Sequence, residues 1–64
     1  MDVKYLTTAE VADRFRTKPA TVRWWRYAGY GPNSVKAGRR RLYPITEVEA
    51  FEARLRAEAE LEAA

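Results

Sequence analysis

Apolar residues recur at helical spacing in the first part of the chain, directly after a helix-start signal. Residues 7–10 are Thr-Thr-Ala-Glu, and Val11 and Phe15 follow four residues apart. In such a capping box the Thr7 hydroxyl accepts a hydrogen bond from the backbone N–H three residues on, and the glutamate side chain accepts one from the N–H of the cap. The pattern predicts a helix over about residues 8–15, preceded by an extended lead-in over residues 1–6.

A second helix is predicted after the break in the pattern at residues 16–18. Pro19 suits the first position of a helix, because its fixed φ is compatible with the helix and its missing N–H is not needed there. The helix should end near Tyr27, with Gly29 as the left-handed residue beyond it. Two short helices joined by about three residues have the outline of a helix-turn-helix.

Residues 30–44 lose the helical spacing and are rich in turn-forming and basic residues. Residues 30–33 (Tyr-Gly-Pro-Asn) have the composition of a loop. We expect residues 34–36 and 40–43 to pair as short strands across a turn at 37–39, with Pro44 ending the second strand.

The last third of the chain predicts a third helix. Residues 46–49 (Thr-Glu-Val-Glu) match a second capping box, and the helix should run to about residue 60 before the chain end frays. Glu52, Arg56 and Glu60 are spaced for ion pairs between successive turns. Three apolar residues form the expected buried stripe: Val48, Phe51 and Leu55. These elements predict one mainly α domain over residues 1–64, with an ordered core of about residues 5–58, built as a small winged helix-turn-helix with three helices and a short β-hairpin wing.

Composition excludes several classes of function. The chain has no cysteine, so it can form neither a disulfide nor a thiolate metal site. It also has no histidine, which is both the commonest metal ligand and the commonest general base. The carboxylates alternate with other residues around helix faces and form no catalytic set. No apolar run approaches the roughly 20 residues of a membrane span, and the N-terminus lacks the pattern of a signal peptide. We therefore expect a cytoplasmic protein that is not an enzyme and that uses no cofactor, no metal and no membrane partner.

Charge is distributed unevenly along the chain. Residues 1–43 hold ten Lys or Arg and three Asp or Glu, a net charge of +7, whereas residues 44–64 hold two Arg and six Glu, a net charge of −4. This polarity fits a domain with one face for a polyanion, although a mixed surface with an acidic tail would have the same counts.

The second helix separates an apolar side from a basic and aromatic side. At about 100° per residue, Val22 and Trp25 fall together and predict the buried side. Trp24 lies on the opposite side, so the two tryptophans cannot both be buried, and we assign Trp25 to the core and Trp24 to the surface. The alternative is a core that extends around the helix to Trp24, with the arginines as solvated surface charges.

The outer side of this helix suits the major groove of DNA. Arg23 can donate two parallel hydrogen bonds to guanine, and Thr21 can contact a phosphate or a base edge. The arginines of the hairpin can bind phosphate groups or enter a narrow minor groove; a solvated basic turn is the alternative. The predicted DNA-binding residues are Lys18, Ala20, Thr21, Arg23, Trp24, Arg26 and Tyr27 around the second helix, and Lys36, Arg39, Arg40 and Arg41 in the hairpin.

The order of these motifs resembles the MerR-like winged helix-turn-helix group. The resemblance spans about residues 5–55 and is carried by Leu-Thr-Thr-Ala-Glu-Val-Ala at 6–12, Pro-Ala-Thr-Val at 19–22, Gly-Arg-Arg-Arg-Leu-Tyr at 38–43 and Glu-Val-Glu-Ala-Phe at 47–51. More closely, the chain is similar to small phage excisionases (recombination directionality factors) and to related short regulators of actinobacteria.

The resemblance implies that the second helix enters the major groove of double-stranded DNA and that the wing meets the backbone or the minor groove. It also implies that neighbouring copies bind attachment-site DNA cooperatively, bend it and direct a partner integrase toward excision, in a bacterial host cell. Three residues depart from the family pattern: Thr17 replaces an apolar turn residue, Lys18 a Ser or Asp cap, and Leu42 a basic residue. Because the long dimerisation helix of full MerR regulators is missing, no small-molecule effector is expected.

Two alternatives to an excisionase remain open at this stage. The same surface would serve a small transcriptional repressor or activator. A protein-interaction module such as an antitoxin or adaptor would instead use Trp24 as the anchor of its interface. Salt separates these classes, because affinity for duplex DNA falls steeply as salt rises.

Overall fold

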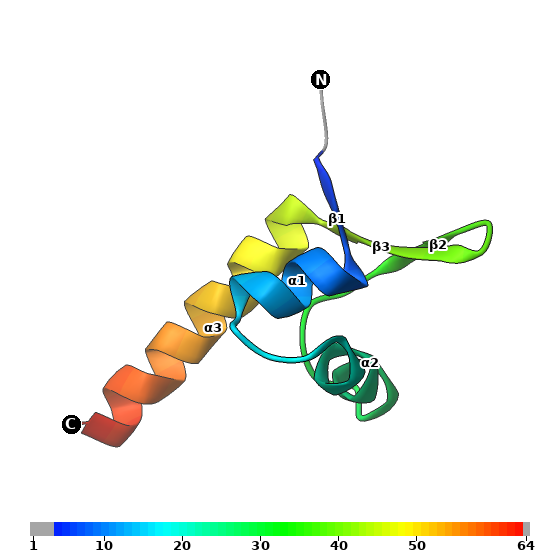
Figure 1. The fold of residues 1–64 in the computed structure, drawn as a ribbon. Coiled ribbons are helices and arrows are strands. Elements are labelled where there is room, and N and C mark those ends of the chain that lie inside the picture. Colours follow the sequence, from blue (N-terminus) through cyan, green and yellow to red (C-terminus); the bar gives the residue numbers. More distant parts are fainter. Residues whose placement is uncertain (1–3, 64) are drawn as a thin grey trace.

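The structure, a computed structural model, describes residues 4–63; residues 1–3 of the predicted lead-in and Ala64 lie outside the described part. Three helices and a three-stranded antiparallel sheet make up the fold, which confirms the mainly α winged helix-turn-helix class (Figure 1). The elements follow the chain as β1 (Tyr5–Thr7), α1 (Thr8–Arg14), α2 (Pro19–Tyr27), β2 (Val35–Ala37), β3 (Arg40–Pro44) and α3 (Ile45–Ala63).

Helix α1 begins at the predicted capping box. The Thr7 hydroxyl accepts a hydrogen bond from the Glu10 N–H at 3.1 Å, and the Thr7 N–H donates to Glu10 Oε1 at 2.8 Å. The chain leaves the helix through Arg16, which has a left-handed φ of 56°. The N–H of Thr17 then donates to the Ala12 carbonyl at 2.8 Å, which closes the turn toward α2.

Helix α2 has the predicted bounds. Lys18 occupies the N-cap position with an extended backbone, and its side chain makes no capping hydrogen bond. At the other end Gly29 has a φ of 72°, as expected for the left-handed residue after a helix. The Gly29 N–H donates to the Arg26 carbonyl at 3.3 Å and the Tyr30 N–H to the Trp25 carbonyl at 2.8 Å, the two bonds of a Schellman motif. The end of α2 is therefore fixed by backbone geometry.

The sheet has the order β1-β3-β2, with β3 in the centre. The predicted hairpin is confirmed as β2 and β3, which turn at Gly38 with a φ of 63°. The extended lead-in was predicted, but its pairing was not: Tyr5 and Leu6, together with Thr7, form β1 and pair with β3, with Leu6 opposite Tyr43. The strand β3 ends at Pro44, as predicted, with Pro44 included as its last residue opposite Tyr5.

Helix α3 begins at Ile45, so the predicted second capping box is wrong and Thr46 lies inside the helix. The Ile45 N–H donates to the Lys4 carbonyl at 2.8 Å, which continues the sheet pairing directly into the helix start. The helix extends to Ala63, beyond the predicted end near residue 60. Glu52 forms its ion pair with Arg14 of α1, through two hydrogen bonds of 2.9 Å, in place of the predicted partner on the next turn of α3.

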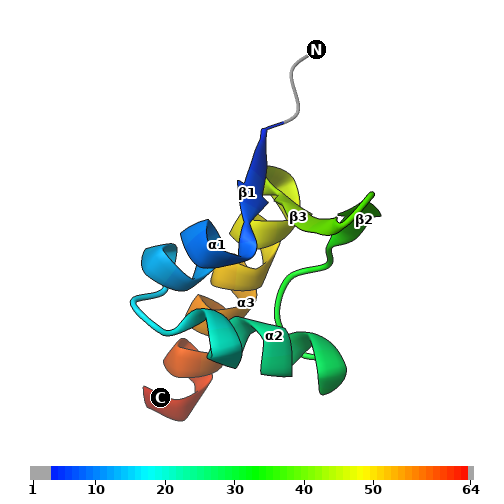
Figure 2. The same ribbon diagram turned by 45° about the vertical axis from the view of Figure 1, so that its right-hand side comes forward.

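The core lies where α1, α2 and the start of α3 meet beneath the sheet. Its buried residues are Val11, Ala12, Val22, Tyr43 and Val48. Next to them an aromatic cluster joins the three helices, because the rings of Trp25 and Phe15 both contact Phe51, with centroids 5.5 Å away in each case. The predicted inward positions of Val22 and Trp25 are thus confirmed. The hairpin and the C-terminal part of α3 project from opposite sides of this core, and α2 lies on the side of the hairpin (Figures 1 and 2).

Candidate nucleic-acid interface

The outer side of α2 carries the residues that its helical spacing predicted. Trp24 is 63% exposed and Tyr27 is 82% exposed, and Ala20 and Arg23 are exposed as well. Trp25 is half-buried against the core. The assignment of Trp24 to the surface and Trp25 to the core is therefore confirmed, and a core that reaches around the helix to Trp24 is excluded.

The basic and aromatic residues of α2 lie on different flanks of the helix. Pro19 and Arg23 face the hairpin, since they line a hollow together with residues of β3, and Arg26 continues this stripe at helical spacing toward the loop at 29–34. About 100° further around the helix, Trp24 lies on the flank away from the hairpin, next to the half-buried Thr21. Between the two flanks Tyr27 and Ala20 form the crest of the helix. The arginines and Trp24 thus meet different parts of any ligand that contacts α2.

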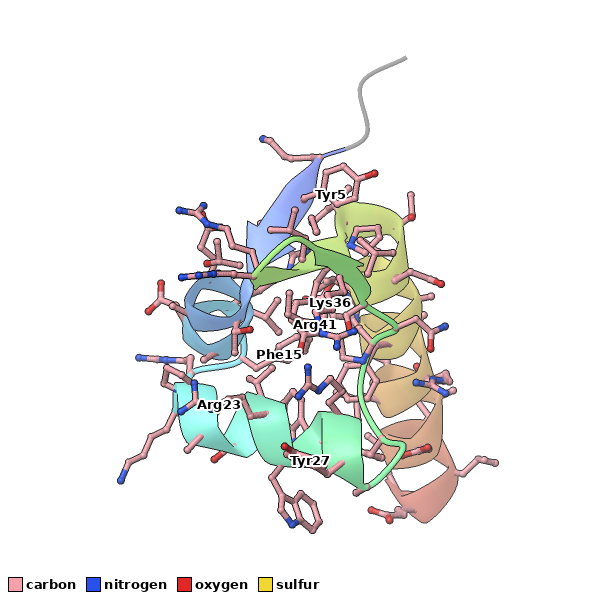
Figure 3. The ribbon with its side chains drawn as sticks, turned by 90° about the vertical axis from the view of Figure 1, so that its right-hand side faces the viewer. Tyr5, Phe15, Arg23, Tyr27, Lys36 and Arg41 are labelled. Carbon is pink, nitrogen blue, oxygen red and sulfur yellow. The ribbon has the colours of Figure 1, made fainter. Side chains whose placement is uncertain are left out.

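The three consecutive arginines of the hairpin have three different environments. Arg39 is exposed in the turn before β3. Arg41 lies opposite Lys36 and, by strand alternation, shares the sheet face of the buried Tyr43, whereas Arg40 lies on the other face. In Figure 3, Lys36 and Arg41 lie between the hairpin and α2, above Arg23 and Tyr27. The register of the hairpin therefore separates Arg40 from Arg41.

Leu42, which departs from the family pattern, is a half-buried residue of the central strand. It lies opposite Thr7 on one side and Val35 on the other. By alternation its side chain lies on the sheet face of Arg40, opposite that of Arg41 and Tyr43.

Arg41 is held in a partly buried position without full hydrogen bonding. Its Nη1 donates to the Ser34 hydroxyl at 3.5 Å, the outer limit of such a bond. Its Nε is buried and has no hydrogen-bond partner within the described residues. A buried donor without an acceptor costs about 1–3 kcal/mol, so an acceptor supplied by a ligand would stabilise this side chain.

The hollow between the hairpin, α1 and α2 brings together residues from three separate segments. It has a volume of about 460 Å³ and is lined by Thr7, Thr8, Ala9, Pro19, Arg23, Arg40 and Arg41. It exists because β1 ends at Thr7, opposite Leu42, while β3 continues two residues further to Arg40. Sequence reasoning identified the three arginines but missed the threonines, whose capping pattern gave only a structural signal.

None of the predicted DNA-binding cations forms an ion pair within the described part of the chain. Within residues 4–63 the ion pair is that of Arg14 and Glu52, which lies between α1 and α3 and outside the set of predicted contacts. The hydrogen bonds from Arg14 lower the pKa of Glu52, and the same bonds raise the pKa of Arg14. No predicted DNA-binding Lys or Arg pairs with a carboxylate of the described chain, so these charges are available to a polyanion. No helix within residues 4–63 is both long and apolar enough to cross a membrane.

Comparison with known proteins identifies this arrangement. The sequence matches the family model of the helix-turn-helix domain over residues 5–56, a span that contains β1, α1, α2, the hairpin and the first half of α3. No curated protein and no solved structure matches the chain at a significant level. The matched span covers most of the 64 residues and includes every predicted DNA-binding residue. The chain therefore belongs to the helix-turn-helix domain family, and its partner is DNA.

Proposed function

We propose that the protein is an excisionase, an architectural factor that binds attachment-site DNA cooperatively, bends it and directs an integrase toward excision. The observation that supports the proposal is that α2 and the hairpin lie side by side and both carry cations, none of which has an ion-pair partner in the described chain (Figure 3). The resemblance of residues 5–55 to small phage excisionases supports the specific role. On this proposal the protein acts in the cytoplasm of a bacterial host.

Helix α2 can enter the major groove. An α-helix with its side chains is about 10–12 Å in diameter, which matches the groove width of about 12 Å. With the crest of α2 in the groove, Arg23 reaches base edges on the hairpin side and can bind guanine O6 and N7 through two hydrogen bonds. Trp24 reaches the other wall, where its ring can contact sugars or thymine methyl groups.

The hairpin lies beside α2, where the adjacent backbone and minor groove would pass. Arg39 lies in the turn between β2 and β3 and is exposed, so it is the cation at the tip of the hairpin. An arginine so placed suits a narrow minor groove, in which the negative potential is enhanced. The helix would thus supply most of the sequence preference and the hairpin most of the electrostatic affinity.

The charge distribution is compatible with neighbouring copies on DNA. The acidic residues concentrate in α3, which projects from the side of the core opposite the hairpin. When copies bind adjacent sites in the same orientation, the acidic helix of one can approach the basic hairpin of the next. Such contacts would make binding cooperative.

A reconstituted excision reaction tests the proposal. The protein, the cognate integrase and a plasmid with both attachment sites are combined, and the excised circle is quantified with increasing protein. We expect excision to depend on the protein and integration to be suppressed by it. Specific, salt-sensitive binding without an effect on recombination would instead identify a transcriptional regulator. Binding that is absent or insensitive to salt would identify a protein-interaction module.

A further inference from the structure

The hollow between α1, α2 and β3 has the donors of an anion site. Three arginines are among the residues that line it: Arg23 of α2, and Arg40 and Arg41 of β3. Thr8 adds a hydroxyl that makes no hydrogen bond within the described residues. None of the seven lining residues is acidic, so nothing in the wall neutralises this charge.

This arrangement is unfavourable for the protein alone. Like charges that share one hollow repel each other. Arg23 and Arg40 are exposed, so their guanidinium groups are accessible to a ligand. An anion in the hollow would reduce the repulsion, and guanidinium groups bind phosphate oxygens through paired hydrogen bonds.

The position of the hollow indicates which anion binds there. It lies between the helix that would enter the major groove and the hairpin that would lie on the neighbouring backbone (Figure 3). A sugar-phosphate strand that borders the groove must pass between these elements. A phosphodiester of that strand is therefore the anion that binding itself brings to the hollow.

We infer that this hollow holds one phosphodiester of the bound duplex, with the exposed Arg40 and the Thr8 hydroxyl as its donors and Arg41 as a further positive charge in its lining. Arg23 closes the hollow on the side of the groove. The inference rests on the proposed binding of duplex DNA, and it adds Thr8, the first residue of the first helix of the helix-turn-helix, to the contacts predicted for α2 and the hairpin. It requires that one phosphate of the site be contacted by both the start of α1 and the hairpin.

Replacement of single DNA phosphates by an uncharged methylphosphonate tests whether one phosphate contacts both Thr8 and the hairpin. Methylphosphonate is placed at single positions along both strands of the binding site, and the affinity of each duplex is measured for the wild type and for Thr8→Val. On unmodified DNA we expect Thr8→Val to weaken binding about fivefold to tenfold. At one position the methylphosphonate should weaken the wild type strongly, and on that duplex Thr8→Val should bind no worse than the wild type. Thr46→Val, an exposed threonine of α3, is the matched control and should behave as the wild type on every duplex.

Arg40→Gln gives a second, independent test, because Arg40 is exposed and its loss should leave the fold intact. At the same phosphate position, the loss of affinity caused by Arg40→Gln and the loss caused by the methylphosphonate should not add. If the affinity losses caused by the protein variant and by the methylphosphonate add at every position, for both Thr8→Val and Arg40→Gln, the inference is overturned while DNA binding itself stays established. Failure of the wild type to bind any unmodified duplex would refute the proposed function instead.

A free phosphate ion offers the same chemistry from another source. Inorganic phosphate is therefore titrated into the protein at constant ionic strength, with the amide signals around Thr8 followed by NMR. We expect no saturable shift at millimolar phosphate. Saturation there, together with additive losses in the methylphosphonate series, would assign the hollow to a free anion and overturn the inference.

Discussion

Trp24 and Trp25 are adjacent in the sequence, yet their replacement should have opposite consequences. Trp25 is half-buried, and its ring lies 5.7 Å from that of Phe15, 6.0 Å from Tyr30 and 5.5 Å from Phe51, measured between centroids. Removal of a core tryptophan costs about 3–5 kcal/mol. Because Trp25 keeps some exposure, we expect Trp25→Ala to lower the free energy of unfolding by about 3 kcal/mol.

That loss is large for a domain of this size. At about 0.05–0.15 kcal/mol per residue, 64 residues give a total free energy of unfolding of about 3–10 kcal/mol. Trp25→Ala should thus remove a third or more of the total. Trp24 is 63% exposed, so Trp24→Ala should change stability by no more than about 0.5 kcal/mol. Its effect should appear in DNA affinity, through the lost contact with the wall of the groove.

Urea unfolding followed by far-ultraviolet circular dichroism measures the change in the free energy of unfolding, and fluorescence anisotropy of a labelled duplex measures the change in DNA affinity. Trp25→Phe is the control, because it keeps an aromatic ring in the cluster and should restore part of the stability. A Trp24→Ala protein that unfolds as readily as Trp25→Ala would refute the assignment of the two faces. Normal DNA affinity of a folded Trp24→Ala protein would remove Trp24 from the interface.

Three further predictions follow from the same geometry. Arg23→Ala should cost about 1–3 kcal/mol on the specific site and relax the preference for one base pair; an equal loss on all duplexes would make Arg23 a phosphate contact. Changing Arg39 and Arg41 together to Ala should weaken binding to all sequences and reduce the slope of log affinity against log salt by about 2, whereas an unchanged slope would place the hairpin off the DNA. Glu52→Gln should lower stability at neutral pH by about 0.2–1 kcal/mol, because it breaks the exposed pair with Arg14. Since the folded-state pKa of Glu52 is lowered, this contribution is present above the ordinary carboxyl pKa and is lost as pH falls through the lowered value, so the urea midpoints of variant and wild type should converge in acid.

The elements that the sequence predicted well are those whose ends are determined locally. Pro19 and Gly29 each impose a backbone conformation, and the Schellman bonds that close α2 involve only residues within that turn. The capping box of Thr7 and Glu10 is equally local, since both bonds lie within four residues. Periodicity then sufficed to separate Trp24 from Trp25.

The elements that were missed depend on partners far away in the sequence. Strand β1 has three residues and no pattern of its own; it forms because Leu6 lies opposite Tyr43 in the central strand. The start of α3 was misplaced for the same reason, since the Ile45 N–H is bound by the Lys4 carbonyl. A local interpretation of residues 46–49 could not detect an acceptor that lies some forty residues earlier.

The candidate site combines both kinds of information. Helical spacing alone places Arg23 and Trp24 on different flanks of α2, but only the tertiary fold shows that the hairpin lies on the side of Arg23. The run at 39–41 appeared in the sequence as one basic cluster, and pairing with β2 distributes it over a turn and two sheet faces. Thr8 joins the arginines only because β3 continues past the end of β1. The end of β1 at Thr7, where the chain turns directly into α1, therefore lies at the edge of the hollow, and only the pairing with β3 brings it there.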